Sequence, residues 1–266
     1  MTEVGEAFEK LVGIMSRLRS PEGCPWDREQ THESLKKYML EETYEVLEAI
    51  DQGDADELKS ELGDLLLQIL FHAQLASEQG MFTIKDVIEC ISAKLIHRHP
   101  HVFGEASVAS AEEVLHRWER IKAEEPGYES RTSILDGIPR ALPALARAMD
   151  VSKRAAGAGF EWSDIQAVLD KVQEEVAELR RELDAGDRER ISQEIGDLLF
   201  TVVNVARWAK VDAEDALRKM IDRFCSRFRQ IEETARTSGR SLEDMSIQEM
   251  DAIWDRAKSE RCEGFQ

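Results

Sequence analysis

Acidic residues recur at one spacing in two stretches of this sequence. Residues 41–66 read EETYEVLEAIDQGDADELKSELGDLL, and residues 174–199 read EEVAELRRELDAGDRERISQEIGDLL. The stretches align without a gap at an offset of 133, and 11 of 26 positions are identical, mostly acids and glycines. Glutamates on ordinary solvated helix faces have no reason to repeat in this way, so the repeat favours a shared chemical role.

The spacing within each stretch predicts a helical hairpin with its acids facing inward. Helical residues advance by about 100°, so Glu42 and Glu45 share one helix face, as do Glu61 and Asp64 on the next helix. Gly53-Asp54 is typical of a helix end followed by a turn. Glu45 and Glu61 are each eight residues from Gly53, and Glu42 and Asp64 are each eleven away, so the pairs meet at matching heights. The second stretch repeats this pattern about Gly186, with Glu175, Glu178, Glu194 and Asp197.

Four carboxylates at one level predict a metal site. Like charges ~4 Å apart repel by roughly 4 kcal/mol at an effective dielectric constant of about 20, so a cation or shared protons must hold them together. Neither set contains histidine or cysteine, and oxygen ligands favour Mg²⁺ or Mn²⁺ over zinc. Glu41 and Glu174 lie beside the two sets and are candidate bases that orient a water molecule. Gly63 and Gly196 are interpreted as small residues where helices approach closely.

The rest of the chain predicts an all-α fold. Apolar residues repeat at three- and four-residue spacing, and strand-like alternation is scarce. The 266 residues carry a net charge of -19, which argues against nucleic acid or an anionic membrane as a partner. Four widely spaced cysteines and the lack of a long apolar run indicate a cytoplasmic protein without a signal peptide.

The repeat extends into two complete helical modules. Residues 123–143 hold three of the six prolines and are interpreted as a linker between modules at 1–122 and 144–266. Downstream of the acids, Lys94-x-x-x-Arg98 matches Arg223-x-x-x-Arg227. Near the module ends, Trp118 and Lys122 match Trp254 and Lys258.

These motifs resemble a known family. EETYE…ELGDLL, with CPWDREQTHESLKKYMLEE before it and KLIHRHPHVFGE after it, resembles the MazG-type nucleoside triphosphate pyrophosphohydrolases of the all-α pyrophosphatase superfamily. The resemblance implies tandem MazG modules with four-helix-bundle cores completed in a homodimer. It also implies Mg²⁺ ligands at Glu175, Glu178, Glu194 and Asp197, and at the matching Glu42, Glu45, Glu61 and Asp64.

A triphosphate substrate needs cations for its charge and a flat surface for its base. The candidates for phosphate contacts are Lys171, Arg223, Arg227 and Lys258 in the second module, and Lys94, Arg98 and Lys122 in the first. Trp254 and Trp118 are candidates for stacking on the base. Each of these residues could instead be an ordinary surface cation or a packing tryptophan. The expected reaction is hydrolysis at the α–β phosphoanhydride of ribo- and deoxyribonucleotides, releasing nucleoside monophosphate and pyrophosphate for housekeeping of the nucleotide pool.

Three alternatives remain open from the sequence. A catalytically silent module would bind a regulatory protein, and a narrower enzyme would act on dUTP or on phosphoribosyl-ATP. The first module is interpreted as the degenerate or specialised copy, because Tyr38 stands where the second module has Lys171. The run His97-Arg-His99-Pro-His101 is interpreted as a helix end stopped by Pro100 rather than as a transition-metal site.

Overall fold

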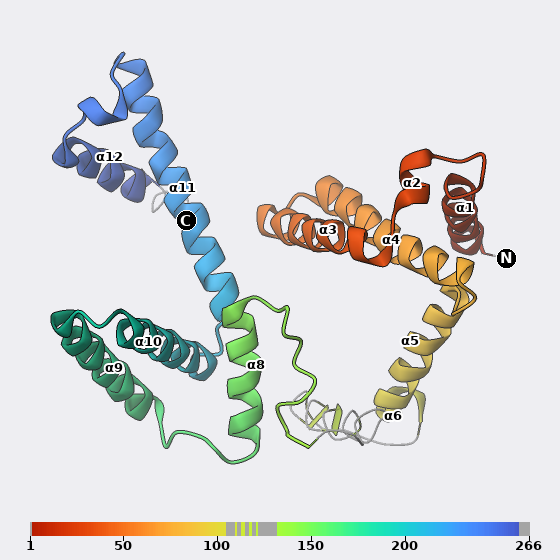
Figure 1. Ribbon diagram of the computed structural model, residues 1–266, viewed down its shortest axis with the longest axis horizontal. Helices are drawn as coiled ribbons and strands as arrows, with labels where there is room; N and C mark the ends of the chain where they lie inside the picture. Colours follow the sequence, from red (N-terminus) through yellow and green to blue (C-terminus); the bar gives the residue numbers. More distant parts are fainter. Residues whose placement is uncertain are drawn as a thin grey trace. The chain divides into compact units, whose positions relative to one another are not determined.

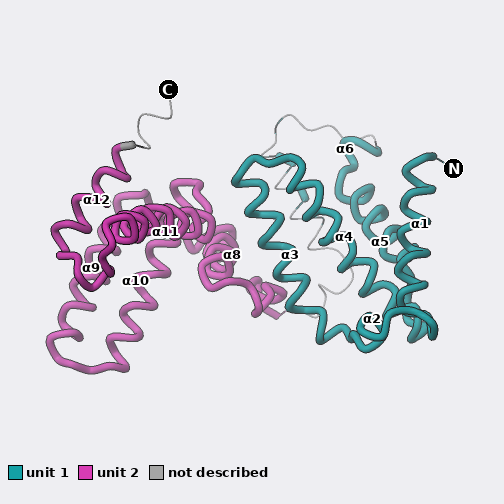
Figure 2. Tube along the Cα trace, turned by 90° about the horizontal axis from the view of Figure 1, so that it is seen from above, with its two compact units in different colours: residues 1–126 teal, residues 127–266 magenta. Residues whose placement is uncertain are grey.

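The chain consists of two helical units. The computed structural model describes residues 2–104 and 132–260, together with residues 110, 113, 114, 117, 118 and 121. The units span Met1–Pro126 and Gly127–Gln266, and the division between them falls inside the segment interpreted as a linker (Figure 2). The described residues form helices and no strands, which confirms the all-α prediction. None of the helices in this described part is long and apolar enough to cross a membrane.

The first unit is built around a helical hairpin. Its helices are α1 (Glu3–Leu18), α2 (Pro25–Glu29), α3 (His32–Gln52), α4 (Ala55–Glu78), α5 (Ile84–Arg98) and α6 (Pro100–Phe103) (Figure 1). Helix α3 begins at a capping box in which Thr31 and Ser34 exchange side-chain and backbone hydrogen bonds. It ends at Gly53, whose left-handed φ of 70° suits a residue without a Cβ. Asp54 then accepts hydrogen bonds from the first backbone amides of α4, so α4 folds back along α3 as the sequence predicts.

Apolar contacts hold α1 and the α3–α4 hairpin together. Met15, Leu35, Phe71 and Leu75 form a buried cluster, and Tyr38 packs against it from α3. At the surface of this cluster, Arg19 pairs with Glu78 at 2.7 Å and also donates to the backbone carbonyls of Asp27 and Gln30. One arginine therefore connects α1 to the end of α4 and to the short helix α2.

The second unit contains a matching hairpin. Its helices are α8 (Ala144–Gly157), α9 (Ile165–Ala185), α10 (Arg188–Trp208), α11 (Ala213–Thr237), a short 3-10 helix η1 (Leu242–Asp244) and α12 (Ile247–Glu260). Gly186 has φ 73° and Asp187 caps α10, so the turn between α9 and α10 repeats the turn at Gly53-Asp54. Helix α8 packs against α10 through Met149, Val203 and their neighbours.

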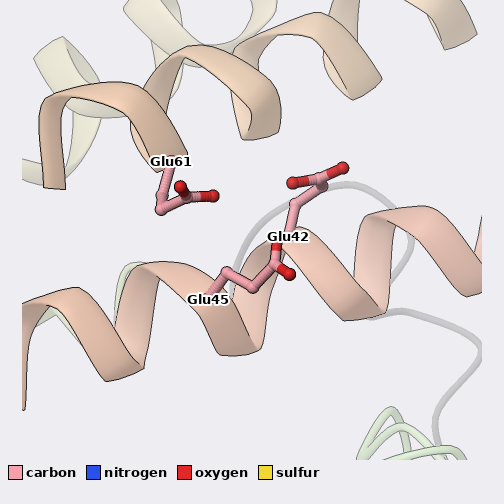
Figure 3. A group of neighbouring side chains, drawn as sticks. All are labelled: Glu42, Glu45 and Glu61. Atoms are coloured by element: carbon pink, nitrogen blue, oxygen red, sulfur yellow. The ribbon is translucent and has the colours of Figure 1, made fainter. Parts of the chain in front are cut away.

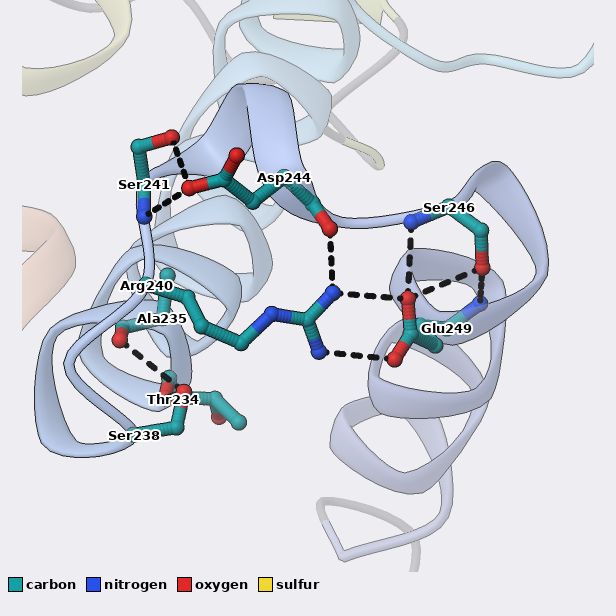
Figure 4. Close-up of polar contacts among 8 residues, drawn as sticks. All are labelled: Thr234, Ala235, Ser238, Arg240, Ser241, Asp244, Ser246 and Glu249. Atoms are coloured by element: carbon teal, nitrogen blue, oxygen red, sulfur yellow. Dashed lines mark hydrogen bonds and ion pairs between the residues drawn. The ribbon is translucent and has the colours of Figure 1, made fainter.

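A polar network folds α12 back against α11. Arg240 follows α11 and donates to the Glu249 carboxylate at 2.8 Å and to the backbone carbonyl of Asp244 (Figure 4). The same carboxylate accepts from the Ser246 amide at 2.7 Å, and Asp244 accepts from Ser241. These bonds fix the η1 turn, which lets the start of α12 approach the end of α11.

The prediction that Gly63 and Gly196 lie where helices approach closely is wrong for the single chain. A Cβ added at Gly63 or Gly196 would meet nothing within 4 Å. Both glycines lie on exposed faces of α4 and α10 rather than at a close helix contact within their unit.

Candidate metal centres

Carboxylates from α3 and α4 meet in the first unit. Oxygen atoms of Glu42, Glu45 and Glu61 lie within 4.8 Å of one another (Figure 3). Asp64 lines the same cavity, and these four residues are called the first acidic cluster. The cluster faces a cavity of about 420 Å³, called the acidic cavity, which is lined by Glu42, Glu45, Glu48, Ala49, Gln52, Glu57, Glu61 and Asp64. The hairpin thus brings together all four residues that the sequence predicts as ligands.

The first acidic cluster is electrostatically strained without a cation. Partial burial, followed by the charges of Asp64 and Glu45, raises the pKa of Glu42 to about 7. Burial and the charge of Glu45 also raise the pKa of Glu61. The cluster therefore retains a proton near neutral pH, and a divalent cation would have to displace that proton to bind.

The second hairpin forms a similar group with a different neighbour. Oxygen atoms of Glu175, Glu194 and Asp197 lie within 4.8 Å of one another, and with Glu178 they are called the second acidic cluster. Burial, followed by the charge of Glu178, raises the pKa of Glu194. Glu175 is only 4% exposed, and its carboxylate is 2.8 Å from the Nζ atom of Lys171. A built-in cation therefore neutralises the most buried acid of this cluster.

Lys171 also contacts the residue predicted as the base. Its Nζ atom lies 2.9 Å from Glu174, and hydrogen bonds to Glu175 and Glu174 raise the pKa of Lys171. Lys171 is thus positioned against the acids, and its one ammonium group contacts two carboxylates. The matching Glu41 is exposed beside the first acidic cluster.

Both clusters fit a hard divalent cation. Every donor in the two groups is a carboxylate oxygen, and their separation allows several oxygens to contact one ion. Mg²⁺ prefers oxygen ligands and keeps part of its water shell, which suits an open cluster on a hairpin. The residues present therefore match Mg²⁺ or Mn²⁺ better than a metal that prefers imidazole or thiolate.

Two arginines near the second cluster were not among the residues predicted from the sequence. Arg181 pairs with Glu178 at 2.8 Å, and Arg190 lies 3.7 Å from Glu182. The internal alignment contains the signal for both, because Glu48 and Glu57 occupy the matching positions in the first hairpin.

The predicted cations and tryptophans pair with one another in both units. The Arg227 guanidinium lies 5.4 Å from the ring centre of Trp254, and Arg98 lies 5.0 Å from that of Trp118. Trp254 also packs at 5.0 Å against Phe224. In the second unit this pair lies on α11 and α12, whereas the second acidic cluster lies on α9 and α10.

The other predicted contacts are distributed over exposed surface. Arg223 is exposed on α11 and its guanidinium donates to the sulfur of Met220 at 3.7 Å. Lys94 and Lys258 are exposed on α5 and α12. Lys122 lies outside the described residues. His99 follows the last residue of α5, with its Nδ1 atom 2.7 Å from the Leu95 carbonyl, and α6 begins at Pro100.

The sequence of this chain is similar to those of known proteins. The family model described as "MazG nucleotide pyrophosphohydrolase domain" matches residues 30–103 and 164–231, which contain the two hairpins. The "Nucleoside triphosphate pyrophosphohydrolase/pyrophosphatase MazG" of Thermotoga maritima is 48% identical over 258 residues, covering 97% of this chain and 98% of that protein. The "Nucleoside triphosphate pyrophosphohydrolase" of Escherichia coli K12 is 45% identical over 259 residues, covering 96% and 98%. A crystal structure of a MazG-related protein from Thermotoga maritima matches 44% of this chain and 99% of its own, with 31% identity and a TM-score of 0.38.

Proposed function

Because the chain belongs to the MazG nucleotide pyrophosphohydrolase family, we propose that it hydrolyses nucleoside triphosphates between the α and β phosphates. The products are nucleoside monophosphate and pyrophosphate. One observation carries the proposal: in each hairpin, carboxylate oxygens from both helices lie within 4.8 Å of one another. Two closely related proteins named as enzymes of this activity support it.

The acidic clusters are the proposed ligands of Mg²⁺. When bound, this ion polarises a phosphoryl oxygen and makes a water molecule more acidic. The chain itself places the ligand carboxylates of the two helices of each hairpin side by side. A glycine in the left-handed conformation ends the first helix, and the aspartate that follows it caps the second helix. Glu174 lies beside Glu175 with its carboxylate exposed, and its proposed role is to accept a proton from the attacking water.

Cations and aromatic rings complete the proposed substrate site. Arg227, held against Trp254, offers positive charge for the phosphates, and the tryptophan offers a flat surface for the base. Arg98 and Trp118 offer the same pair in the first module. The remaining candidates, for phosphate contacts alone, are Lys171, Arg223, Lys258, Lys94 and Lys122.

A homodimer is part of the proposal. Large apolar side chains are exposed along α5, including Ile91, Leu95 and Ile96, and along α11, including Ile221 and Phe224. Large apolar side chains left exposed along a helix are typical of a face covered by another subunit. Two copies packed through these helices would form the four-helix bundles that the family resemblance implies.

The proposed biological role is housekeeping of cytoplasmic nucleotide pools, with broad use of ribo- and deoxyribonucleoside triphosphates. The test is incubation of the full chain with each triphosphate and Mg²⁺, followed by identification of products by phosphorus NMR. Monophosphate with pyrophosphate supports the proposal, and diphosphate with phosphate contradicts it. Turnover of dUTP or phosphoribosyl-ATP alone identifies the narrower enzyme, and no turnover of any nucleotide favours the silent interaction module.

Two single variants assign the reaction to one module or both. Glu45→Ala removes a ligand from the first acidic cluster, and Glu178→Ala removes the matching ligand from the second. Loss of turnover in only one variant identifies the module that performs the reaction. Circular dichroism of both variants controls for loss of the fold.

A further inference from the structure

Three histidines lie where α5 ends and the short helix α6 begins (Figure 1). They are His97, His99 and His101, in a run of sequence that the proposed function does not use. His99 follows the last residue of α5, and α6 starts at Pro100, as the sequence predicts for a helix end. The ring centres of His99 and His101 are 5.6 Å apart, and the ring planes are tilted by 52°. The helix end thus brings two imidazoles together.

The backbone between these two rings is closely fixed. The amides of Val102 and Phe103 both donate to the His99 carbonyl, at 2.9 and 3.0 Å, and the Gly104 amide donates to the Pro100 carbonyl at 3.1 Å. A Cβ at Gly104 would lie 2.9 Å from the Pro100 carbonyl oxygen, so a larger residue could not take this position without a shift. The turn therefore fixes the Cα atoms that carry the two imidazoles.

Each ring keeps one nitrogen available for a ligand. The Nδ1 atom of His99 lies 2.7 Å from the Leu95 carbonyl, which can only accept a hydrogen bond. Nδ1 therefore carries the proton, and the Nε2 atom of the neutral ring keeps its lone pair. The Nδ1 atom of His101 is buried and, within the part of the chain that the structure describes, has no hydrogen-bond partner. A buried polar atom left unpaired costs about 1–3 kcal/mol, so its presence points to a ligand.

The separation of the rings fits an ion bound by both. A zinc–nitrogen bond of about 2.0–2.1 Å and a ring radius of roughly 1.1 Å place the ion about 3.2 Å from each ring centre. Ring centres 5.6 Å apart then make an angle of about 120° at the ion, which is close to the tetrahedral angle of zinc sites. Imidazole nitrogen is also a ligand that zinc prefers, unlike Mg²⁺.

A second histidine pair in the same unit shows a different arrangement. The Nδ1 atoms of His32 and His72 lie 2.8 Å apart and their ring centres 5.1 Å apart, with ring planes within 6°. The gap between the nitrogens and the radius of each ring together account for the separation of the centres. The rings therefore meet head to head, with an N–H of one ring donating to the other. These two nitrogens satisfy each other and leave no room for an ion.

We propose that His99 and His101 form a binding site for a divalent transition-metal ion, and that zinc is the ion it fits. The ligands are Nε2 of His99 and Nδ1 of His101, and water completes the coordination. The Leu95 carbonyl holds the His99 ring in the tautomer that binds the metal. The acidic clusters offer only carboxylate oxygens, so the two kinds of site select different metals. This inference goes beyond the proposed function and does not depend on it.

Zinc titration of the full chain by isothermal titration calorimetry tests the proposal. Excess Mg²⁺ is present, because it competes with zinc for the oxygen ligands of the acidic clusters but not for imidazole. Loss of an outer partner alone weakens metal binding by about 10–100-fold, so His99→Gln and His101→Gln should each weaken zinc binding at this site at least about tenfold. The controls are His97→Gln, at an exposed position in the same run, and His32→Gln, which breaks the other pair; both should bind zinc as wild type does.

Nitrogen-15 NMR of the histidine rings gives a readout that needs no folded variant. In metal-free wild type, His99 should show the tautomer protonated at Nδ1. Zinc should then shift the Nε2 signal of His99 and the Nδ1 signal of His101, and should leave His32 and His72 unchanged. The variants serve to assign these signals, and circular dichroism checks that each variant is folded.

The proposal is overturned if zinc binding in excess Mg²⁺ is unchanged in His99→Gln or in His101→Gln, or if His97→Gln weakens it equally. It is also overturned if zinc shifts neither ring signal in wild type, since the metal then binds elsewhere on the chain. Zinc binding that disappears in Glu45→Gln with Glu178→Gln, and persists in both histidine variants, assigns the ion to the acidic clusters and refutes the site. Failure of the proposed function is a separate result, because it appears only in the product assay.

Discussion

Replacing Lys171 with methionine tests how much the Lys171 charge stabilises the second hairpin against the repulsion between its carboxylates. Methionine keeps a flexible chain of similar length but removes the charge that contacts Glu174 and Glu175. Glu175 is only 4% exposed, so without Lys171 its charge faces Glu194 and Asp197 with no nearby cation. The variant is therefore expected to be less stable than wild type when no metal is present.

The size of the effect follows from the burial of both partners. Removing one partner of a fully buried ion pair costs about 3–5 kcal/mol, because an uncompensated charge remains inside the protein. The Lys171 side chain is 30% exposed and that of Glu175 is 6% exposed, so water screens part of the interaction. A loss of about 2 kcal/mol in the free energy of unfolding is the corresponding estimate.

Urea unfolding of the full chain in EDTA, followed by circular dichroism, measures this loss. The double variant Lys171→Met with Glu175→Gln should recover most of it, since the glutamine removes the unpaired charge. Lys153→Met, at an exposed position on α8, controls for the loss of a lysine. Equal stability of Lys171→Met and wild type in EDTA, or no recovery in the double variant, would refute the reasoning.

Three further predictions concern residues outside the acidic clusters. Hydrogen bonds from Arg207 lower the pKa of Glu161 from 4.5 to about 2, so their stabilisation is present above pH 4.5 and is lost as the pH falls to about 2. Unfolding experiments from pH 6 to about 2 should show the stability gap between wild type and Glu161→Gln closing over that range, and a constant gap would contradict this. Gly186→Ala should lower the stability by about 1–2 kcal/mol, because alanine is strained at φ 73°; an unchanged melting temperature would count against that conformation. Gly63→Ala should raise the stability by about 0.5–1 kcal/mol, since its Cβ meets nothing within 4 Å, and a loss of stability would mean that another chain approaches this face.

The hairpins could be predicted from the sequence because local rules determine them. Gly53 and Gly186 end their helices in the left-handed conformation, and the aspartate after each glycine caps the next helix. Equal distances from those turns then place Glu42 and Glu45 near Glu61. The second hairpin repeats the same turn and the same spacing.

The neighbours of the acids could not be predicted in the same way. Lys171 is one turn from Glu175, a spacing that allows an ion pair but does not require one in preference to a substrate contact. Trp254 packs against Phe224 and Arg227 because the Arg240 network turns α12 back onto α11. The capping pairs Ser241–Asp244 and Ser246–Glu249 are a local signal for that turn, but they do not specify which residues of α11 the tryptophan meets. The roles of Gly63 and Gly196 depend on what approaches the exposed helix faces, which a pattern within one chain does not contain.

Binding of Mn²⁺ to the metal-free chain, followed by electron paramagnetic resonance, tests most directly whether the carboxylates of the hairpins hold a divalent cation. The account predicts that wild type binds Mn²⁺, that Mg²⁺ competes for it, and that Glu45→Gln with Glu178→Gln greatly weakens binding in both modules. Absence of binding by wild type, or unchanged binding by the double variant, would contradict the account.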